Sequence, residues 1–357
     1  MKVLVICSNL CYPYIEMSGN KAIYALLQGL SGMDGVAIDV LSYITEDGKA
    51  VQDYGNLKFH YLKAGGLFEF RLLAYKKALS FIKGRYDIVH DFSSLPLLGG
   101  LTGVLGKSLK ARSVHSLVTI NETFLGSPKL NFGNFLLDKL VATDRNTYSR
   151  LNFKNVLYIP LGVDFNKVEE GEVIPKMPKK VVFLGSLEKR KGVDVFISAA
   201  KMRLEAGSTL KFYIYTYGKE VRDVSFSSNL EKVRKLVGKA DIEVKVGNFD
   251  VAKIFGPETI YVQANTSRQG TLGVPLTTLE AVAYGSPCIL SNIYALEDIA
   301  KHCLIYEASS PKQLNLAIKT LEEKRNLDTA DAAKFVRSAH NIAGISKEVY
   351  SLYRSLL

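Results

Sequence analysis

Residues 259–292 predict a strand, a loop, a helix and a second strand in that order, the repeating unit of a parallel α/β sheet. The apolar run 260–264 is followed by a polar, glycine-bearing loop over 265–273. Pro275 suits the first turn of a helix because no backbone N–H is needed there, and Gly285 ends a helix at little steric cost. The glycines therefore lie at a helix entrance, where free N–H groups and the positive dipole end favour a phosphate.

Glu280 is the one charged residue inside that expected helix. At helical spacing it shares a face with Leu276, Thr277, Ala283 and Tyr284. A carboxylate among such neighbours is either paired in a buried site or available to a ligand that carries hydroxyl groups, such as a ribose. The alternative, a carboxylate at a partly exposed helix edge, stays open.

Two successive series of strand–loop–helix patterns are separated by residues 169–180, a polar stretch with two prolines. The sequence therefore predicts an α/β protein with an N-terminal domain over 1–168, a linker over 169–180, a C-terminal domain over 181–340 and a C-terminal helix over 341–357. The two domains are expected to face a central cleft. The amphipathic C-terminal helix is expected to pack back on one of them, with the N-terminal domain preferred.

The charge balance of the 357 residues indicates an anionic partner. There are 46 Lys and Arg residues against 35 Asp and Glu, a net charge of +11. Lysine–aromatic clusters and zinc-ligand spacings are not evident, so no nucleic-acid partner and no bound metal are expected. The four cysteines (Cys7, Cys11, Cys288 and Cys303) form no disulfide framework, which favours a reducing cytoplasm.

Residues 67–83 predict a helix with an apolar stripe at spacings of three and four, made of Phe68, Leu72, Tyr75, Leu79 and Ile82. The basic residues of the same segment, Arg71, Lys76, Lys77 and Lys83, lie largely off that stripe. Two interpretations stay open. In one, the basic face contacts an anionic membrane surface, as in a peripheral protein at the inner membrane face. In the other, which we prefer, the stripe packs in the core and the charges are solvated.

Two features of the first domain are candidate site residues. His115 lies near the carboxyl end of the strand expected over 111–118, the edge at which open α/β sheets bind ligands, although a structural role is the commoner one for such a histidine. The loop after the first strand ends in Ser18-Gly19-Asn20 before a helix. Because no G-x-G-x-x-G follows that strand, a dinucleotide site is not supported.

The second domain has two candidate phosphate loops, each after an expected strand. In the loop 186–192, Lys191 precedes Gly192 at a helix entrance and adds a full positive charge to the helix dipole. The other loop contains Gly270 and Gly273 and precedes the helix of Glu280. Loops that follow parallel strands lie at the same edge of the sheet, so the two can converge on one phosphorylated ligand.

Four segments resemble a known family: IPLGVD, VVFLGSLEKRKGVDVFISAA, TTLEAVAYGSPCILSNIYALEDI and VHSL. They are similar to the glycosyl transferases group 1 family (family four), which contains retaining, nucleotide-sugar-dependent enzymes with the GT-B fold of two Rossmann-like domains. The resemblance implies that Glu280 holds the nucleotide ribose and Lys191 the diphosphate. It also implies that His115 lies beside the donor sugar as the catalytic residue, and that amides near Gly19 approach the phosphates. No cofactor or metal is expected, because helix ends and basic side chains neutralise the leaving phosphate.

Two positions depart from the family pattern. An arginine is usual directly after the glycine of the first C-domain strand, where this chain has Ser186; Lys189 and Arg190 are close enough in sequence to substitute. A family glutamate that contacts the donor sugar falls at Leu272 by counting back from Glu280. Because the loop is about three residues longer here, Gln269 is the preferred counterpart. The expected nucleotide-sugar site contains Gly19, Ser186, Lys191, Gln269, Gly270, Thr271, Leu272 and Glu280.

These observations favour an enzyme that moves a sugar from a nucleoside-diphosphate-sugar to a glycan or lipid-linked acceptor with retention of configuration. Ser186 and Gln269 motivate an alternative, a nucleotide-sugar-binding protein with a degenerate catalytic site. A third hypothesis is a nucleotide-sugar epimerase with the same fold.

Overall fold

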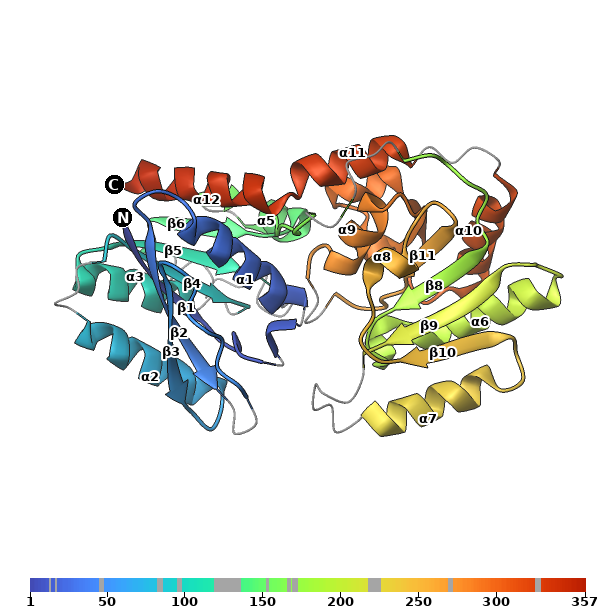
Figure 1. Ribbon diagram of the computed structural model, residues 1–357, viewed down its shortest axis with the longest axis horizontal. Helices are drawn as coiled ribbons and strands as arrows, with labels where there is room; N and C mark the ends of the chain where they lie inside the picture. The colour runs from blue at the N-terminus through green and yellow to red at the C-terminus, as the bar shows by residue number, and fades with distance from the viewer. Residues whose placement is uncertain are drawn as a thin grey trace. The chain divides into compact units, whose positions relative to one another are not determined.

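The chain forms two compact units in a computed structural model that describes residues 1–12, 14–16, 18–44, 48–81, 86–94, 98–118, 136–151, 154–165, 168, 173–217, 226–268, 272–324 and 329–357. The first unit, here called the N-terminal domain, contains Met1–Asp164, Gln269–Gly273 and His340–Leu357. The second, the C-terminal domain, contains Phe165–Arg268 and Val274–Ala339. Figure 1 shows a parallel sheet flanked by helices in each unit, so the predicted α/β class with two Rossmann-like domains is confirmed.

The N-terminal domain is built on a seven-stranded parallel sheet in the order β3-β2-β1-β4-β5-β6-β7. Its inner strands are mostly apolar and buried, as both faces of a parallel sheet are covered by helices, whereas the two edge strands are largely half-buried. They are β1 (Lys2–Cys7), β2 (Ala37–Ile44), β3 (Leu57–Lys63), β4 (Ile88–Ser93), β5 (Arg112–Leu117), β6 (Lys139–Ala142) and β7 (Val156–Tyr158).

Helices cover the sheet of the N-terminal domain. They are α1 (Ser18–Ser31), α2 (Leu67–Ser80), α3 (Leu98–Leu109), the short α5 (Arg145–Arg150), α12 (Ile342–Leu356) and a 3-10 turn, η1 (Tyr14–Glu16). One core cluster joins Phe70 and Ala74 of α2 with Leu105 of α3 and Leu4 of β1, so α2 and α3 cover the same face of the sheet.

The C-terminal helix α12 belongs to the N-terminal domain and packs beside α1 (Figure 1), as expected from the sequence. Its buried Tyr353 reaches the sheet, where its hydroxyl lies 2.5 Å from Nδ1 of His90 on β4. The same histidine shares a 2.7 Å hydrogen bond with Ser116 Oγ on β5. The last helix is therefore tied to the centre of the first domain.

The C-terminal domain is built on a six-stranded parallel sheet in the order β10-β9-β8-β11-β12-β13. Its strands are β8 (Lys180–Leu184), β9 (Lys211–Thr216), β10 (Ile242–Val246), β11 (Thr259–Gln263), β12 (Cys288–Ser291) and β13 (Leu304–Tyr306). Its helices are α6 (Val193–Glu205), α7 (Phe226–Val237), α8 (Val251–Ile254), α9 (Leu276–Ala283), α10 (Pro311–Glu323) and α11 (Ala330–Ala339), with 3-10 turns η3 (Lys189–Lys191), η4 (Asn292–Tyr294) and η5 (Asp298–His302). Of the expected linker, residues 169–172 lie outside the described residues and 173–179 contain no helix or strand.

The sequence-based orientation of α2 is wrong. Phe68 and Leu72, expected in the core, are 79% and 57% exposed, whereas Phe70 and Ala74 are fully buried. Residues 70, 74 and 78 also repeat at helical spacing, and the small side chains of Ala74 and Ala78 let the helix approach the sheet closely. Arg71 turns inward with them and is buried. The last expected members of the segment, Ile82 and Lys83, lie outside the described residues.

Candidate active site

The two candidate phosphate loops of the C-terminal domain lie side by side at the carboxyl ends of β8 and β11. The backbone N–H of Thr266 donates to the carbonyl of Arg190 at 2.9 Å. Gly192 has φ of 72°, and a Cβ built there would lie 1.9 Å from the carbonyl oxygen of Ala264. Only glycine fits a backbone in the left-handed region that is pressed against another strand end. The predicted convergence of the two loops therefore holds for their described residues.

Lys191 lies at the entrance of α6, where the N–H groups of the first turn have no helical partner. The turn before it is tight, since the amides of Lys191 and Gly192 donate to the carbonyls of Glu188 and Lys189 at 2.9 Å each. Burial, together with the neighbouring positive charge of Arg190, lowers the pKa of Lys191 to about 8, although the negative charge of Glu188 opposes the effect. A bound phosphate would supply the negative charge that this lysine needs, so the arrangement suits an anion.

Glu188 organises the position at which the family arginine is missing. Its Oε1 accepts a 3.2 Å hydrogen bond from Ser186 Oγ, and its Oε2 lies 2.5 Å from Arg190 Nε. Arg190, one of the two cations expected to replace the arginine, is therefore paired with a carboxylate. Lys189, the other, is exposed.

Glu280 is 8% exposed in the middle of α9. Of the two sequence-based interpretations, the buried carboxylate is the one that the structure shows. Thr277, on the same side of the helix, shares a 2.9 Å hydrogen bond with Tyr261 Oη of β11, so this face of α9 packs on the central strand of the sheet.

A chain of buried polar side chains connects β11 with the loop that follows it. Tyr261 Oη donates to Gln263 Oε1 at 2.5 Å, and Gln263 Nε2 donates to Asn265 Oδ1 at 2.7 Å. Asn265 Nδ2 in turn donates to Tyr294 Oη at 2.7 Å. The chain fixes the strand end from which the glycine loop departs.

Sequence reasoning missed a buried ion pair next to this loop. Arg268 Nη2 lies 2.7 Å from Glu297 Oε1, with side-chain exposures of 7% and 0%. Arg268 directly precedes Gln269, so the pair anchors the start of the loop that is expected to contact the donor sugar. Because the partners are 29 residues apart in sequence, no local pattern predicts their pairing.

Gln269, Gly270 and Thr271 lie outside the described residues. Leu272, which follows them, is buried and belongs to the N-terminal unit. In that unit it lies near Gly19, where an added Cβ would be 3.4 Å from Leu272 Cδ2. Gly19 itself is in the first turn of α1, which begins at Ser18, slightly earlier than expected.

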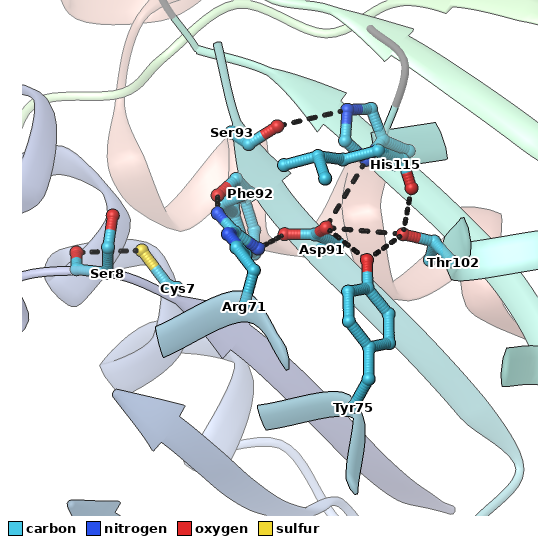
Figure 2. A network of polar contacts seen from close by, with 10 residues as sticks. Cys7, Ser8, Arg71, Tyr75, Asp91, Phe92, Ser93, Thr102 and His115 are labelled. Atoms are coloured by element: carbon cyan, nitrogen blue, oxygen red, sulfur yellow. Dashed lines mark hydrogen bonds and ion pairs between the residues drawn. The ribbon is translucent and has the colours of Figure 1, made fainter. Parts of the chain in front are cut away.

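His115 lies in a buried polar cluster between β4, β5, α2 and α3 (Figure 2). Its side chain is fully buried, with Nε2 at 3.3 Å from Ser93 Oγ and Nδ1 at 3.7 Å from Asp91 Oδ2. Burial lowers the pKa of His115 to about 4, although the negative charge of Asp91 opposes that effect. The imidazole is therefore neutral near pH 7.

Asp91 is the centre of this cluster (Figure 2). It forms a short ion pair with Arg71, whose Nη2 also donates to the carbonyl of Phe92 at 3.0 Å. Tyr75 Oη and Thr102 Oγ1 each donate to Asp91 Oδ2 at 3.2 Å. Every charge is compensated inside the domain. Direct contact of His115 with a sugar would require this cluster to open, so its catalytic role stays a prediction.

Among the described residues, no group of three His, Cys, Asp or Glu side chains is arranged to hold a metal ion. The four cysteines are free thiols. The described helices also include none that is both long and apolar enough to cross a bilayer.

Residues 178–324 match the sequence profile of the family described as glycosyl transferases group 1. The C-terminal domain is a group 1 glycosyltransferase domain. The profile covers β8 to α10, and therefore both candidate phosphate loops and the helix of Glu280. Gly19 and His115 lie outside the matched segment.

The whole chain resembles several solved structures in fold. Sucrose-phosphate synthase from Thermosynechococcus elongatus is 15% identical, with a TM-score of 0.75 over 100% of this chain and 99% of that one. A glycosyltransferase from Rickettsia africae is 14% identical, with a TM-score of 0.73 over 99% and 98% of the two chains. Anabaena Alr3699/HepE in complex with UDP-glucose is 12% identical, with a TM-score of 0.70 over 99% and 100%. No curated protein sequence matches the chain significantly.

These likenesses agree with the GT-B fold of two Rossmann-like domains that the sequence predicts. Within the glycosyltransferase domain, the structure brings two loops together. One contains Ser186 and Lys191, and the other contains Thr266 and Arg268. Three residues that complete the second loop are outside the described part of the chain.

Proposed function

We propose that the chain is a glycosyltransferase that moves a sugar from a nucleoside-diphosphate-sugar to a glycan or lipid-linked acceptor with retention of configuration. The observation that supports it most is the half-buried Lys191, with its pKa lowered to about 8, at the entrance of α6 in a group 1 glycosyltransferase domain. A lysine at a helix N-terminus suits the diphosphate of such a donor, because it adds a full positive charge to the positive end of the helix dipole. The UDP-glucose bound by Alr3699/HepE makes uridine the first nucleotide to test.

In this proposal the protein binds the leaving diphosphate and the ribose. Lys191 and the free amides of α6 neutralise the phosphate charge that develops as the bond from the anomeric carbon to the phosphate oxygen breaks. Glu280 accepts hydrogen bonds from ribose hydroxyls. The acceptor oxygen bonds to the anomeric carbon on the same face, and its proton passes to the departing phosphate oxygen. The reaction needs no oxidant, and we propose that it needs no metal.

The remaining site residues keep the roles that the resemblance implies. Amides near Gly19 approach the phosphates, Gln269 donates to a sugar hydroxyl, and Gly270, Thr271 and Leu272 complete the loop. His115 lies beside the donor sugar. For His115, the full burial of its side chain implies that the role also requires the Asp91 cluster to open.

A second candidate is a nucleotide-sugar-binding protein that does not transfer sugar. The pairing of Arg190 with Glu188 favours it, because one of the two cations expected to replace the family arginine is then neutralised by a carboxylate. Such a protein binds the donor and does not turn it over.

The proposal is tested by incubating the purified protein with radiolabelled UDP-sugars and a glycan or lipid extract, and by measuring both released UDP and labelled product. Lys191→Met should lower kcat/KM by at least a hundredfold, since it removes the charge that stabilises the leaving group. Lys232→Met is the matched control, because Lys232 is exposed on α7 of the same domain and has no role in the proposed site. Binding without any UDP release supports the second candidate, and equal rates in the two variants contradict the role of Lys191.

A further inference from the structure

Six large apolar side chains are exposed on α2 and α3 of the N-terminal domain. Scattered exposed leucines are ordinary, but a contiguous set marks an interaction surface. Leu67 is 55% exposed, Phe68 79%, Leu72 57%, Leu79 41%, Leu101 50% and Val104 50%.

These side chains belong to one surface, here called the α2–α3 surface. The two helices cover the same face of the sheet and are in direct contact, since Tyr75 Oη lies 3.3 Å from Thr102 Oγ1. Figure 1 shows α2 and α3 on the same side of the domain. Phe68, Leu72 and Leu79 follow one another at helical spacing on the side of α2 away from its buried residues.

Folding of the domain does not require the α2–α3 surface to be apolar. The inner side of α2 already supplies Phe70, Ala74 and Ala78 to the core. Arg71 on the same inner side fixes the helix to β4 through Asp91 and the carbonyl of Phe92. The outer apolar side chains keep 41–79% of their surface exposed, and contact with a second surface would bury it.

The rim of the α2–α3 surface is basic. Five exposed lysines lie on α2, α3 or the residues that flank them: Lys63, Lys76, Lys77, Lys107 and Lys110. The one acidic residue of the two helices, Glu69, accepts a hydrogen bond from the backbone N–H of Gly65 at 2.7 Å. Apolar side chains that insert below the headgroups and lysines that meet their phosphates are the two requirements of interfacial binding.

We propose that the α2–α3 surface docks on an anionic phospholipid bilayer. Charge complementarity selects this partner, because a neutral apolar partner would leave the lysine rim without counter-charges. Leu67 and Phe68, the most exposed residue of the set, begin α2 just after the carboxyl end of β3. That edge of the sheet is where α/β domains bind ligands, so the docked bilayer would lie next to the acceptor end of the N-terminal domain. In this last respect the inference rests on the proposed function, and of its two acceptor classes it favours the lipid-linked one.

Vesicle binding of the full-length protein tests the proposal. Co-sedimentation is measured with vesicles of phosphatidylcholine containing 30% phosphatidylglycerol, and with pure phosphatidylcholine. We expect binding to the anionic vesicles that weakens as salt is raised. The double variant Lys76→Glu/Lys77→Glu should bind at least about thirtyfold more weakly. Each lysine contributes about 1 kcal/mol to binding, and every 1.4 kcal/mol corresponds to roughly a tenfold change in affinity. Phe68→Ser/Leu72→Ser should lose at least tenfold.

Matched controls carry the same changes on the C-terminal domain. Lys232→Glu/Lys253→Glu has the same change of net charge, and Leu236→Ser/Leu316→Ser replaces two exposed leucines. Both should bind vesicles like the unmodified protein. Equal binding by all variants, or no binding by the unmodified protein, would overturn the proposal. A concentration-dependent dimer that Phe68→Ser/Leu72→Ser abolishes, without vesicle binding, would also overturn it and assign the surface to a second copy of the chain.

The outcome is separable from that of the proposed function. Transfer from a UDP-sugar to a detergent-solubilised acceptor extract, with release of UDP, does not depend on docking, so Phe68→Ser/Leu72→Ser should retain it. Vesicle binding without UDP release would leave the docking surface standing and contradict the transferase.

Discussion

Replacement of Gly192 by alanine should damage the phosphate loop in a way that replacement of other glycines does not. The residue has φ of 72°, where an L-residue costs roughly 1–2 kcal/mol. Its new Cβ would also lie 1.9 Å from the carbonyl oxygen of Ala264, so the loop must move away from β11. That movement breaks the 2.9 Å hydrogen bond from Thr266 to Arg190, worth about 1 kcal/mol. We expect a total loss of about 3 kcal/mol in the free energy of unfolding.

Gly207→Ala separates the two contributions. Gly207 has a similar φ of 81°, but a Cβ there meets nothing within 4 Å. It should therefore cost only the backbone strain, about 1 kcal/mol. Thermal denaturation measures both losses of stability, because a domain of this size loses about 2–4 °C in melting temperature per kcal/mol. The melting temperature should therefore fall by about 2–4 °C in Gly207→Ala and by about 6–12 °C in Gly192→Ala. Nucleotide-sugar affinity should fall only in Gly192→Ala. Equal melting temperatures and equal affinities would refute the close approach of the loop to β11.

Three further predictions follow from buried charges. Arg71→Met leaves the carboxylate of Asp91 buried without its ion pair, so it should lower the free energy of unfolding measured in urea by about 3–5 kcal/mol. The double variant Arg71→Met/Asp91→Asn should recover part of that loss; if the effects of the two substitutions simply add, the pairing is contradicted. Glu297→Gln removes the carboxylate paired with buried Arg268, so it should lower the free energy of unfolding by about 3 kcal/mol and raise the dissociation constant for the donor. An unchanged donor affinity in calorimetry would show that the pair does not hold the donor loop. Burial lowers the pKa of His90 from 6.5 to about 3, so between these two pH values the unfolded chain binds a proton at this residue and the folded chain does not. The free energy of unfolding therefore decreases as the pH falls through that window, and His90→Gln should reduce the slope by up to about 1.4 kcal/mol per pH unit; an unchanged slope would contradict the depressed pKa.

Local patterns of apolar, glycine and proline residues predict the strands and helices of this fold well. The stretch from β11 to β12 shows why, since its apolar runs are bounded by Pro275 and Gly285 and the elements form where those residues allow them. The burial of Glu280 was likewise predictable from the apolar and small residues around it. Local chemistry and the tertiary structure agree at these positions.

The orientation of α2 was not predictable, because two sets of apolar residues repeat at helical spacing in the same helix. The inner set prevails because Arg71 is on its side and finds Asp91 20 residues later in the chain. A prediction from the hydrophobicity of single residues places such an arginine on the solvent side of a helix. Phe68, Leu72 and Leu79 of the expected stripe are outside for that reason, whereas its Tyr75 reaches Asp91 inside the domain.

His115 shows the same limit in the candidate site. Its position on β5 follows from the sequence, but its burial depends on Asp91, Thr102 and Ser93, which arrive from other elements. Position along a strand predicts the edge of the sheet at which a side chain lies. It does not predict which neighbours cover it.

The central claim is that the C-terminal domain binds a nucleoside-diphosphate-sugar through Lys191 and Glu280, and thermal stabilisation tests it most directly. The purified protein is melted with UDP-, GDP-, ADP- and dTDP-sugars, and the measurement is repeated with Glu280→Ala and Lys191→Met. A ligand at about 100 times its dissociation constant should add about 2.7 kcal/mol, a rise of about 5–10 °C. The account predicts such a rise with one nucleotide series and its loss in both variants. No rise with any of the four series, or a rise that both variants retain, would contradict it.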